Sequence, residues 1–272
     1  MRIFISVDIE GVAGVVASEH GRRGNADYEL ARRLMTDETN AAIAGAAEAG
    51  ATEIAVADSH GPMTNLIAAE IDPRARLVSG KPRPLSMIQG VRPDDHGVVL
   101  IGYHAAAGRR GVLAHTINSR AFSRIDVNGV QASEATLFAG HAAEIGVPLL
   151  AASGDDCLAR DLADQFPEAR AIIVKEALGA AAADSLAPRA SCDLIRQEVA
   201  AAVSGPRPAA RMVTDPPLRV SVRFVTQIQA DVAALLPFCD REDSTTVSFE
   251  VASYAEAIGV LATFSFAAMG VS

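Results

Sequence analysis

Residues 2–11 read Arg-Ile-Phe-Ile-Ser-Val-Asp-Ile-Glu-Gly, and they provide the framework for interpreting the rest of the chain. Residues 2–7 are mostly apolar and β-prone, which predicts a buried strand. In an extended chain residues i and i+2 point the same way, so Asp8 and Glu10 should project together from the end of this strand. Two carboxylates this close repel each other unless a cation joins them or one takes a proton. The stretch therefore indicates a metal site or an acid–base pair, with a solvated turn as the alternative.

The bulk composition limits the class of protein. The chain has 272 residues, half of them hydrophobic, which suits one large domain or one large and one small domain. Its net charge of −9 does not suit a nucleic-acid backbone or an anionic membrane surface, so neither partner is expected. The three cysteines are far apart and form no metal-type pair, which predicts reduced thiols in a cytoplasmic protein. No signal peptide and no membrane span are expected, because the apolar runs are too short.

Strand and helix patterns alternate after the first strand. The predicted strands are short apolar runs at residues 53–57, 97–101, 147–152 and 171–175. The predicted helices lie at residues 28–49, 134–145 and 191–203, with a short one beginning near Pro62. Residues 72–92 are Pro-rich and expected to be irregular. The alternation predicts an α/β fold with a doubly wound, mostly parallel sheet.

A Pro-rich segment, residues 205–217, separates two parts of the chain. We interpret residues 1–204 as the α/β catalytic core, residues 205–217 as a linker, and residues 218–272 as a small C-terminal α+β unit that is either separate or packs as part of the core. This unit should contain strands at residues 218–225 and 245–251 and a final helix from about residue 253. Within the core, residues 124–131 read as a hairpin with Asn128-Gly129 as its type I′ turn.

Residue types that bind metals follow three of the predicted strands. Asp8 and Glu10 follow the first strand, His60 the second and His104 the third. The carboxyl ends of strands in an open α/β sheet come together, so we expect a shared site. Mixed imidazole and carboxylate ligands suit Zn²⁺, Mn²⁺, Co²⁺ or Fe²⁺ better than Ca²⁺ or Mg²⁺.

Several further polar residues are candidates for the same site. Glu134 is either a fifth ligand or an acid that complements the dipole of the helix it begins. Five protein ligands would exceed the usual three of a catalytic zinc and would fit two metals that share a carboxylate. His115, on a nearby loop, is a candidate general base, general acid or oxyanion stabiliser. Asp155, Asp156 and Lys175 either support the site or serve only as helix caps and strand-end charges.

With these residues identified, the sequence resembles the D-aminopeptidase family of binuclear zinc metallopeptidases, the DppA type, peptidase family M55. Residues 6–11, Ser-Val-Asp-Ile-Glu-Gly, match the S-x-D-x-E-G signature of that family. Residues 58–60 (Asp-Ser-His), residues 102–105 (Gly-Tyr-His-Ala), His115 and Glu134 follow in the order and spacing of the family. The similarity runs over essentially the whole chain.

The resemblance implies two zinc ions per subunit that share Asp8 as a bridge. Glu10 and His60 would complete one site, and His104 and Glu134 would complete the other. Glu134 changes under this resemblance from one of two alternatives to an implied ligand.

The implied reaction removes an N-terminal D-amino acid, typically D-Ala, from a short peptide, with His115 as the catalytic side chain near the metals. The implied assembly is a homo-oligomer, a ring-shaped decamer whose channel encloses the active sites. The sequence departs from the family at Ser133, where Gly is usual, and at residues 136–138, Thr-Leu-Phe, where a Gly-Leu-Asn stretch is usual. The resemblance therefore implies the ligand set but not the preferred substrate side chain.

Two other functional classes remain as alternatives. The first is a Mg²⁺-dependent phosphatase of the haloacid-dehalogenase type, because residues 8–11 imitate its D-x-D-G start with Asp8 as nucleophile. Glu10 in place of the second Asp, and the lack of any role for the histidines, argue against it. The second is a metal-stabilised binding protein without catalysis, which would need a closed site. The glycines at positions 11, 61 and 102 suggest room for a substrate and favour an enzyme.

Overall fold

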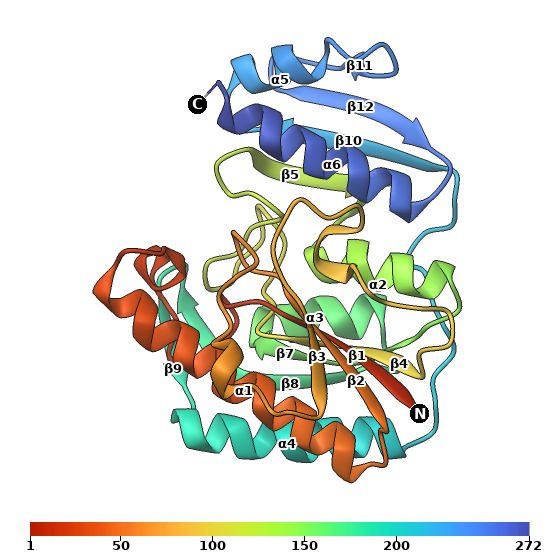
Figure 1. The fold of residues 1–272 in the computed structure, drawn as a ribbon. Coiled ribbons are helices and arrows are strands. Elements are labelled where there is room, and N and C mark those ends of the chain that lie inside the picture. The colour runs from red at the N-terminus through yellow and green to blue at the C-terminus, as the bar shows by residue number, and fades with distance from the viewer. Residues whose placement is uncertain (272) are drawn as a thin grey trace.

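The central element of the fold is strand β1, Arg2–Val7. The computed structural model describes residues 1–271 and places β1 inside a seven-stranded sheet with the order β3-β2-β1-β4-β7-β8-β9. Strands β2 (Glu53–Asp58) and β4 (Gly97–Ile101) flank β1, and both pair with it in parallel. The direction of strand addition reverses at β1, and Figure 1 shows this sheet in the lower part of the molecule. The predicted α/β fold with a doubly wound, mostly parallel sheet is confirmed.

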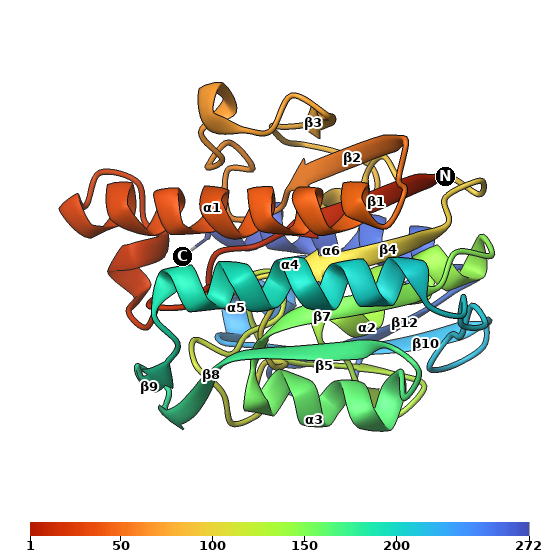
Figure 2. The ribbon, with the colours of Figure 1, turned by 90° about the horizontal axis from the view of Figure 1, so that it is seen from below.

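Helices cover both faces of this sheet. The remaining strands are β3 (Ala75–Val78), β7 (Leu149–Asp155) and β8 (Arg170–Gly179), all parallel, with β9 (Ala182–Ser185) antiparallel at the edge. Helices α1 (Ala26–Glu48) and α4 (Pro188–Ser204) lie side by side on one face (Figure 2). Helices α2 (Glu134–Glu144) and α3 (Asp156–Gln165) pack on the opposite face.

The alternation of side chains along β1 explains the two layers. Ile3, Ile5 and Val7 pack in one cluster with the apolar faces of α1 and α4. Phe4 points to the other side and packs with residues of α2 and α3. Every residue of β1 is buried, as expected for a central strand of a parallel sheet covered on both faces.

A second sheet, with the order β11-β12-β10-β5-β6, lies above the first. Its strands are β5 (Phe122–Val127), β6 (Val130–Gln131), β10 (Leu218–Phe224), β11 (Asp240–Arg241) and β12 (Thr246–Val251). Asn128 and Gly129 join β5 to β6 with φ values of 48° and 81°, as a type I′ turn requires. The predicted hairpin is confirmed, and β5 pairs antiparallel with β10.

The second sheet is thus built from two distant segments of the chain, residues 122–131 and residues 218–251. Helix α5 (Gln227–Ala233) and helix α6 (Tyr254–Met269) pack on it. Helix α6 also contributes Ile258 to the cluster that Phe4 forms with α2 and α3 on one face of the first sheet. No helix within residues 1–271 combines the length and the apolar character needed to cross a membrane. The division into residues 1–204, 205–217 and 218–272 remains a proposal. Of its two versions, we keep the one in which the last unit packs as part of the core.

Several local predictions were wrong. No helix begins near Pro62, where the chain forms turns that precede a short 3₁₀ segment, Ala68–Glu70. The segment expected to be irregular contains β3 and a second 3₁₀ segment, Ser86–Ile88, and another 3₁₀ turn lies at Ser18–Gly21. Strand β7 extends to Asp155, beyond its predicted end. Such short elements depend on neighbouring strands and loops more than on their own sequence pattern.

Candidate metal centre

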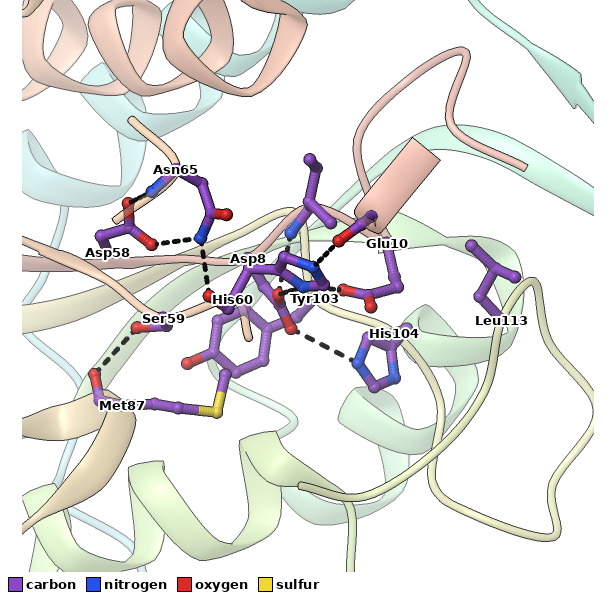
Figure 3. A network of polar contacts seen from close by, with 12 residues as sticks. Asp8, Glu10, Asp58, Ser59, His60, Asn65, Met87, Tyr103, His104 and Leu113 are labelled. Carbon is purple, nitrogen blue, oxygen red and sulfur yellow. Dashed lines mark hydrogen bonds and ion pairs between the residues drawn. The ribbon is translucent and has the colours of Figure 1, made fainter. Parts of the chain in front are cut away.

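The site is assembled where the chain continues past β1 and β4. The backbone N–H of Asp8 donates to the carbonyl of Ile101 at 2.8 Å, and the N–H of Gly11 donates to the carbonyl of Gly102 at 2.7 Å. These two bonds continue the pairing of the strands beyond their ends and place His104 beside Asp8 (Figure 3). The expectation that the carboxyl ends of β1 and β4 come together is confirmed.

The sequence suggested that Gly11 and Gly102 leave room for a substrate. The structure shows a different need for glycine where the segments after β1 and β4 meet. A Cβ on Gly11 would collide with the carbonyl oxygen of Tyr103, and a Cβ on Gly102 would collide with that of Asp8. Gly102 also has a φ of +69°, which favours glycine. Gly11 and Gly102 therefore allow two backbones to touch and do not provide space for a substrate. Only Gly61, of the three glycines considered, has no atom within 4 Å of a built Cβ.

His60 presents one ring nitrogen to the carboxylates. Its Nε2 donates to the carbonyl of Gly21 at 2.7 Å, which assigns the proton of the neutral ring to Nε2. Its Nδ1 lies 3.1 Å from Asp8 Oδ1 and 3.0 Å from Glu10 Oε2. An imidazole lone pair facing two carboxylates is the arrangement expected around a shared cation.

His104 lies deeper and is oriented in the same way. Its Nδ1 donates to the carbonyl of Ala105 at 3.0 Å, so Nε2 carries the lone pair. That Nε2 lies 3.4 Å from Asp8 Oδ2 and 3.4 Å from Glu134 Oε2. Within residues 1–271, His104 Nε2 and Glu134 Oε2 are buried without a hydrogen-bond partner. Buried polar atoms are almost always paired, so two unpaired atoms facing each other indicate the place of an ion.

The alternative role of Glu134 as a helix-terminal acid does not explain its position. Ser133 already caps α2, because its Oγ accepts the N–H of Thr136 at 3.1 Å. The Oε1 of Glu134 accepts the N–H of Ile117 at 2.6 Å, and its carboxylate is 2% exposed. The side chain is therefore turned away from the helix end and towards His104.

His115 completes the cluster from the loop after β4. Its ring stacks on that of His104, with centroids 4.2 Å apart and an interplanar angle of 13°. Its Nδ1 donates to the carbonyl of Leu113 at 3.0 Å, and its Nε2 lies 3.8 Å from Glu134 Oε1. Ligand atoms of His104, His115 and Glu134, and likewise those of Asp8, Glu10 and His104, lie within 4.8 Å of one another.

The charges in this cluster depend on one another. Burial acts to raise the pKa of Asp8, but the imidazoles of His104 and His60 outweigh it and hold that pKa well below its ordinary value. Burial acts to lower the pKa of both histidines. At His60 the carboxylates of Glu10 and Asp8 outweigh burial, and the pKa of His60 lies well above 6.5. At His104 the carboxylates of Glu134 and Asp8 do the same, and the pKa of His104 also lies well above 6.5. The site therefore demands positive charge, which a divalent cation supplies while leaving the imidazoles neutral, as ligation requires.

One acid near the cluster, Asp58, has structural contacts. Asp58, at the end of β2, accepts the N–H of Leu66 at 2.7 Å and the side-chain amide of Asn65 at 2.8 Å. Asn65 in turn donates to the carbonyl of His60 at 2.6 Å, so Asp58 holds the turn that carries this histidine. Sequence reasoning gave Asp58 no separate role, although its place at a strand end was a usable signal.

The residues whose roles were left open fall into different classes. Asp155 is both a helix cap and a support for the site. Its Oδ1 caps α3 by accepting the N–H of Leu158. Its Oδ2 accepts the N–H of Val112 at 2.7 Å, in the loop that carries His115. Asp156 pairs with Arg160 on the same helix. Lys175 is 2% exposed, in contact with the loop after β1.

A cavity of about 250 Å³ opens in front of the cluster. Asp8, Glu10, His60, His115 and Glu134 line it. Its lining also includes Lys81, Arg83, Arg120 and four residues of α6, namely Ala262, Ser265, Phe266 and Met269. The cavity therefore combines carboxylates with cationic side chains, and part of its lining comes from a helix that packs on the second sheet.

Comparisons with known proteins agree with this geometry. The D-aminopeptidase family model, Peptidase_M55, matches residues 1–263. The chain is 32% identical over 276 residues to a D-aminopeptidase of Bacillus subtilis (strain 168), covering 100% of this chain and 99% of the relative. It is also similar to the structure of the Zn-dependent D-aminopeptidase DppA from Bacillus subtilis, a self-compartmentalizing protease, with a TM-score of 0.94, 31% identity and coverage of 99% and 98%. This chain belongs to the D-aminopeptidase family, peptidase family M55.

Proposed function

We propose that the protein is a metal-dependent aminopeptidase that removes N-terminal D-amino acids, of the D-Ala type, from short peptides with two zinc ions per subunit. The observation that carries the proposal is a pair of buried atoms that face each other and have no hydrogen-bond partner among residues 1–271, His104 Nε2 and Glu134 Oε2, the former also facing Asp8. Family membership and the Zn-dependent relative support the same reaction and the same metal.

The donor set fits two ions that share Asp8, whose two carboxylate oxygens face different partners. Oδ1 faces His60, and Oδ2 faces His104. Glu10 would complete the first site and Glu134 the second. The set of three carboxylates and two imidazoles suits zinc. When bound, paired zinc ions lower the pKa of water and polarise a peptide carbonyl.

His115 is the side chain best placed to move a proton. Its Nδ1 hydrogen is used by the carbonyl of Leu113, so in the neutral ring Nε2 is free to accept one. The stacked ring of His104 and the contact with Glu134 fix its orientation beside the cavity. We assign it as the general base that later returns the proton to the departing amine.

The cavity supports a short substrate. A volume of about 250 Å³ has room for only a few residues of a peptide. Lys81, Arg83 and Arg120 in the lining of the cavity would attract the terminal carboxylate of such a peptide. The departure from the family beside Glu134 bears on which substrate side chain fits.

We further propose a homo-oligomer, a ring-shaped decamer, in which the active sites face an enclosed channel. The solved relative is a self-compartmentalizing protease. Large apolar side chains such as Leu235 (80% exposed), Leu178 (68%) and Leu30 (60%) lie on the surface of this chain. We place the protein in the cytoplasm, because its three cysteines are unpaired.

Elemental analysis of metal per chain, on protein purified without a His-tag, tests the proposal together with cleavage of D-Ala and L-Ala dipeptides. We expect nearly two zinc ions per chain and cleavage of the D-substrate, abolished by a chelator and restored by zinc. Neither the phosphatase nor the binding-protein alternative is supported by the comparisons. Zinc-free protein that hydrolyses phosphate esters with added Mg²⁺ would overturn the proposal.

A further inference from the structure

A buried lysine holds the loop that follows the Asp8–Glu10 motif. The Nζ of Lys175, on β8, donates to the carbonyl of Glu10 at 2.6 Å, of Val12 at 2.9 Å and of Val15 at 2.6 Å. All three of its N–H bonds are thereby used, and all three acceptors belong to one loop. We propose that Lys175 is a positioning residue, which fixes the backbone of Glu10 so that its carboxylate faces the metal site.

The choice of lysine at this position is informative. The chain has 24 Lys and Arg residues, and only two of them, Lys81 and Lys175, are lysine. An ammonium group directs three donors to the corners of a pyramid, whereas the guanidinium of arginine directs its donors within one plane. Three carbonyls that converge on one point therefore require lysine, even in a chain that uses arginine elsewhere.

Lys175 supplies donors that the loop itself provides only in part, since the carbonyl of Val12 also accepts the N–H of Val15 at 3.1 Å. Residues 10–15 belong to neither a helix nor a strand, and a buried carbonyl without a donor is costly. Burying a charged ammonium is costly as well, so the arrangement persists because the charge is fully hydrogen-bonded and lies near carboxylates. Burial lowers the pKa of Lys175 to about 8, against the opposing effect of Glu38, Asp155 and Glu10.

A second buried side chain holds the same loop from α1. Oε1 of Glu38 accepts the N–H of Ala13 at 3.0 Å and the hydroxyl of Ser191 at 2.7 Å. The loop is thus held between a cation on β8 and an acid on α1, two elements that the metal site itself does not use. One end of this fixed segment is Glu10, whose Oε2 lies 3.0 Å from His60 Nδ1.

The inference rests on the proposed function, because it takes Glu10 as a ligand of one of two ions. Removing Lys175 should then weaken that ion selectively. The ion assigned to Asp8, His104 and Glu134 should keep its affinity, since Lys175 contacts none of these three residues directly. Loss of a residue that orients a metal ligand typically weakens metal binding about 10–100-fold.

The test is a Co²⁺ titration of the metal-depleted full chain, followed by visible absorption, for wild type, Lys175→Met and Lys175→Arg. Wild type should bind two equivalents. Lys175→Met should bind one equivalent as wild type does and the other about 10–100-fold more weakly. Lys175→Arg keeps the charge but lacks three convergent donors, so it should show the same selective loss. This second variant keeps the inference testable if Lys175→Met does not fold.

Arg2→Met is the matched control. Arg2 is also a buried cation, 8% exposed, paired with Asp95 at the opposite end of β1. Its loss should lower the melting temperature and leave both Co²⁺ equivalents unchanged. Two wild-type equivalents in both Lys175 variants, or an equal weakening of both, would overturn the inference. A wild type that binds fewer than two equivalents would instead count against the proposed function.

Discussion

At the scale of single residues, the chemistry depends on which atom of each side chain is left available. His60, His104 and His115 each use one ring nitrogen to donate to a backbone carbonyl, and each turns the other nitrogen towards a carboxylate. The backbone thus assigns the tautomer of all three rings. Glu134 behaves similarly, because one of its oxygens is used by the N–H of Ile117 and the other faces His104.

His115→Ala should separate binding from turnover. His115 stacks on His104 but is the most exposed of the three rings in the cluster, so its removal leaves Asp8, Glu10, His60, His104 and Glu134 in place. We expect a fall in kcat of about 10²–10⁴-fold, the usual contribution of a general acid–base group. Metal per chain should stay at the wild-type value by elemental analysis, and a parallel loss of metal would mean that His115 is a ligand.

Glu38 should make stability depend on pH. Burial raises the pKa of Glu38 to about 7, against the hydrogen bonds from Ser191 and Ala13. The folded state therefore binds more protons than the unfolded state between about pH 4.5 and 7, and the free energy of unfolding falls as pH rises through this range. The contribution is at most about 3 kcal/mol.

Glu38→Gln keeps an acceptor for Ala13 and Ser191 but cannot ionise. The drop in unfolding free energy between pH 5 and pH 8 should therefore be smaller in this variant than in wild type. Urea denaturation of both proteins in the same metal state measures it. An equal drop in the two proteins would show that Glu38 is not the group responsible.

At the scale of elements, the site depends on how closely the extensions of β1 and β4 approach each other. Two backbone hydrogen bonds join them, and glycine at positions 11 and 102 is what permits the contact. The carboxylates and His104 therefore share one rigid junction instead of lying on separate flexible loops.

Gly11→Ala should disrupt this junction. A methyl group there meets the carbonyl of Tyr103 and must push the two extensions apart, so we expect destabilisation of about 1–3 kcal/mol and weakened metal binding. Gly259→Ala on α6 is the control, because a Cβ there meets no atom within 4 Å and alanine favours a helix. Thermal melts and metal content distinguish the two, and normal metal binding in Gly11→Ala would contradict the role of the junction.

At the scale of the whole molecule, the cavity is a product of both sheets. The segments that follow β1, β2 and β4, together with the start of α2, supply the proposed ligands, and α6, packed on the second sheet, supplies part of the cavity lining. The ammonium of Lys81 lies 5.5 Å from the centre of the Phe266 ring. This contact links the loop after β3 of the first sheet to α6. Under the proposed function, the C-terminal segment would therefore affect substrate binding, while none of the proposed metal ligands belongs to it.

Phe266→Ala should change substrate binding and leave metal binding alone. The contact of Phe266 with Lys81 holds the Lys81 ammonium at the cavity, where it would meet the substrate carboxylate. Such an exposed cation–π contact is worth about 0.5–1 kcal/mol, so freeing Lys81 should raise KM for a short peptide by at most about 2–5-fold. The value of kcat and the metal content should be close to wild type, because the proton-transfer group and the ligands are undisturbed. Steady-state kinetics on a D-Ala dipeptide measures this, and an unchanged KM would place Phe266 outside the substrate's reach.

Much of the fold and the site was predictable from sequence because the signals are local. An apolar run marks a buried strand wherever it occurs, so β1 and β4 were located to within a residue, and parallel strands must end at one edge of the sheet. That rule is enough to group Asp8, Glu10, His60 and His104 from the sequence alone. The order of those residues, rather than any one of them, carried the resemblance to the family.

Only the tertiary structure decided the contacts between distant segments. For Glu134, the sequence pattern allows both a helix-terminal acid and a buried group that faces His104. The choice depends on the rotamer of Glu134 and on the loop that contains Ile117. The pairing of β5 with β10 and the attachment of Lys175 to the carbonyls of Glu10, Val12 and Val15 join residues far apart in the chain. Such contacts are selected by packing and by the need to satisfy every buried polar group, which are properties of the folded chain as a whole.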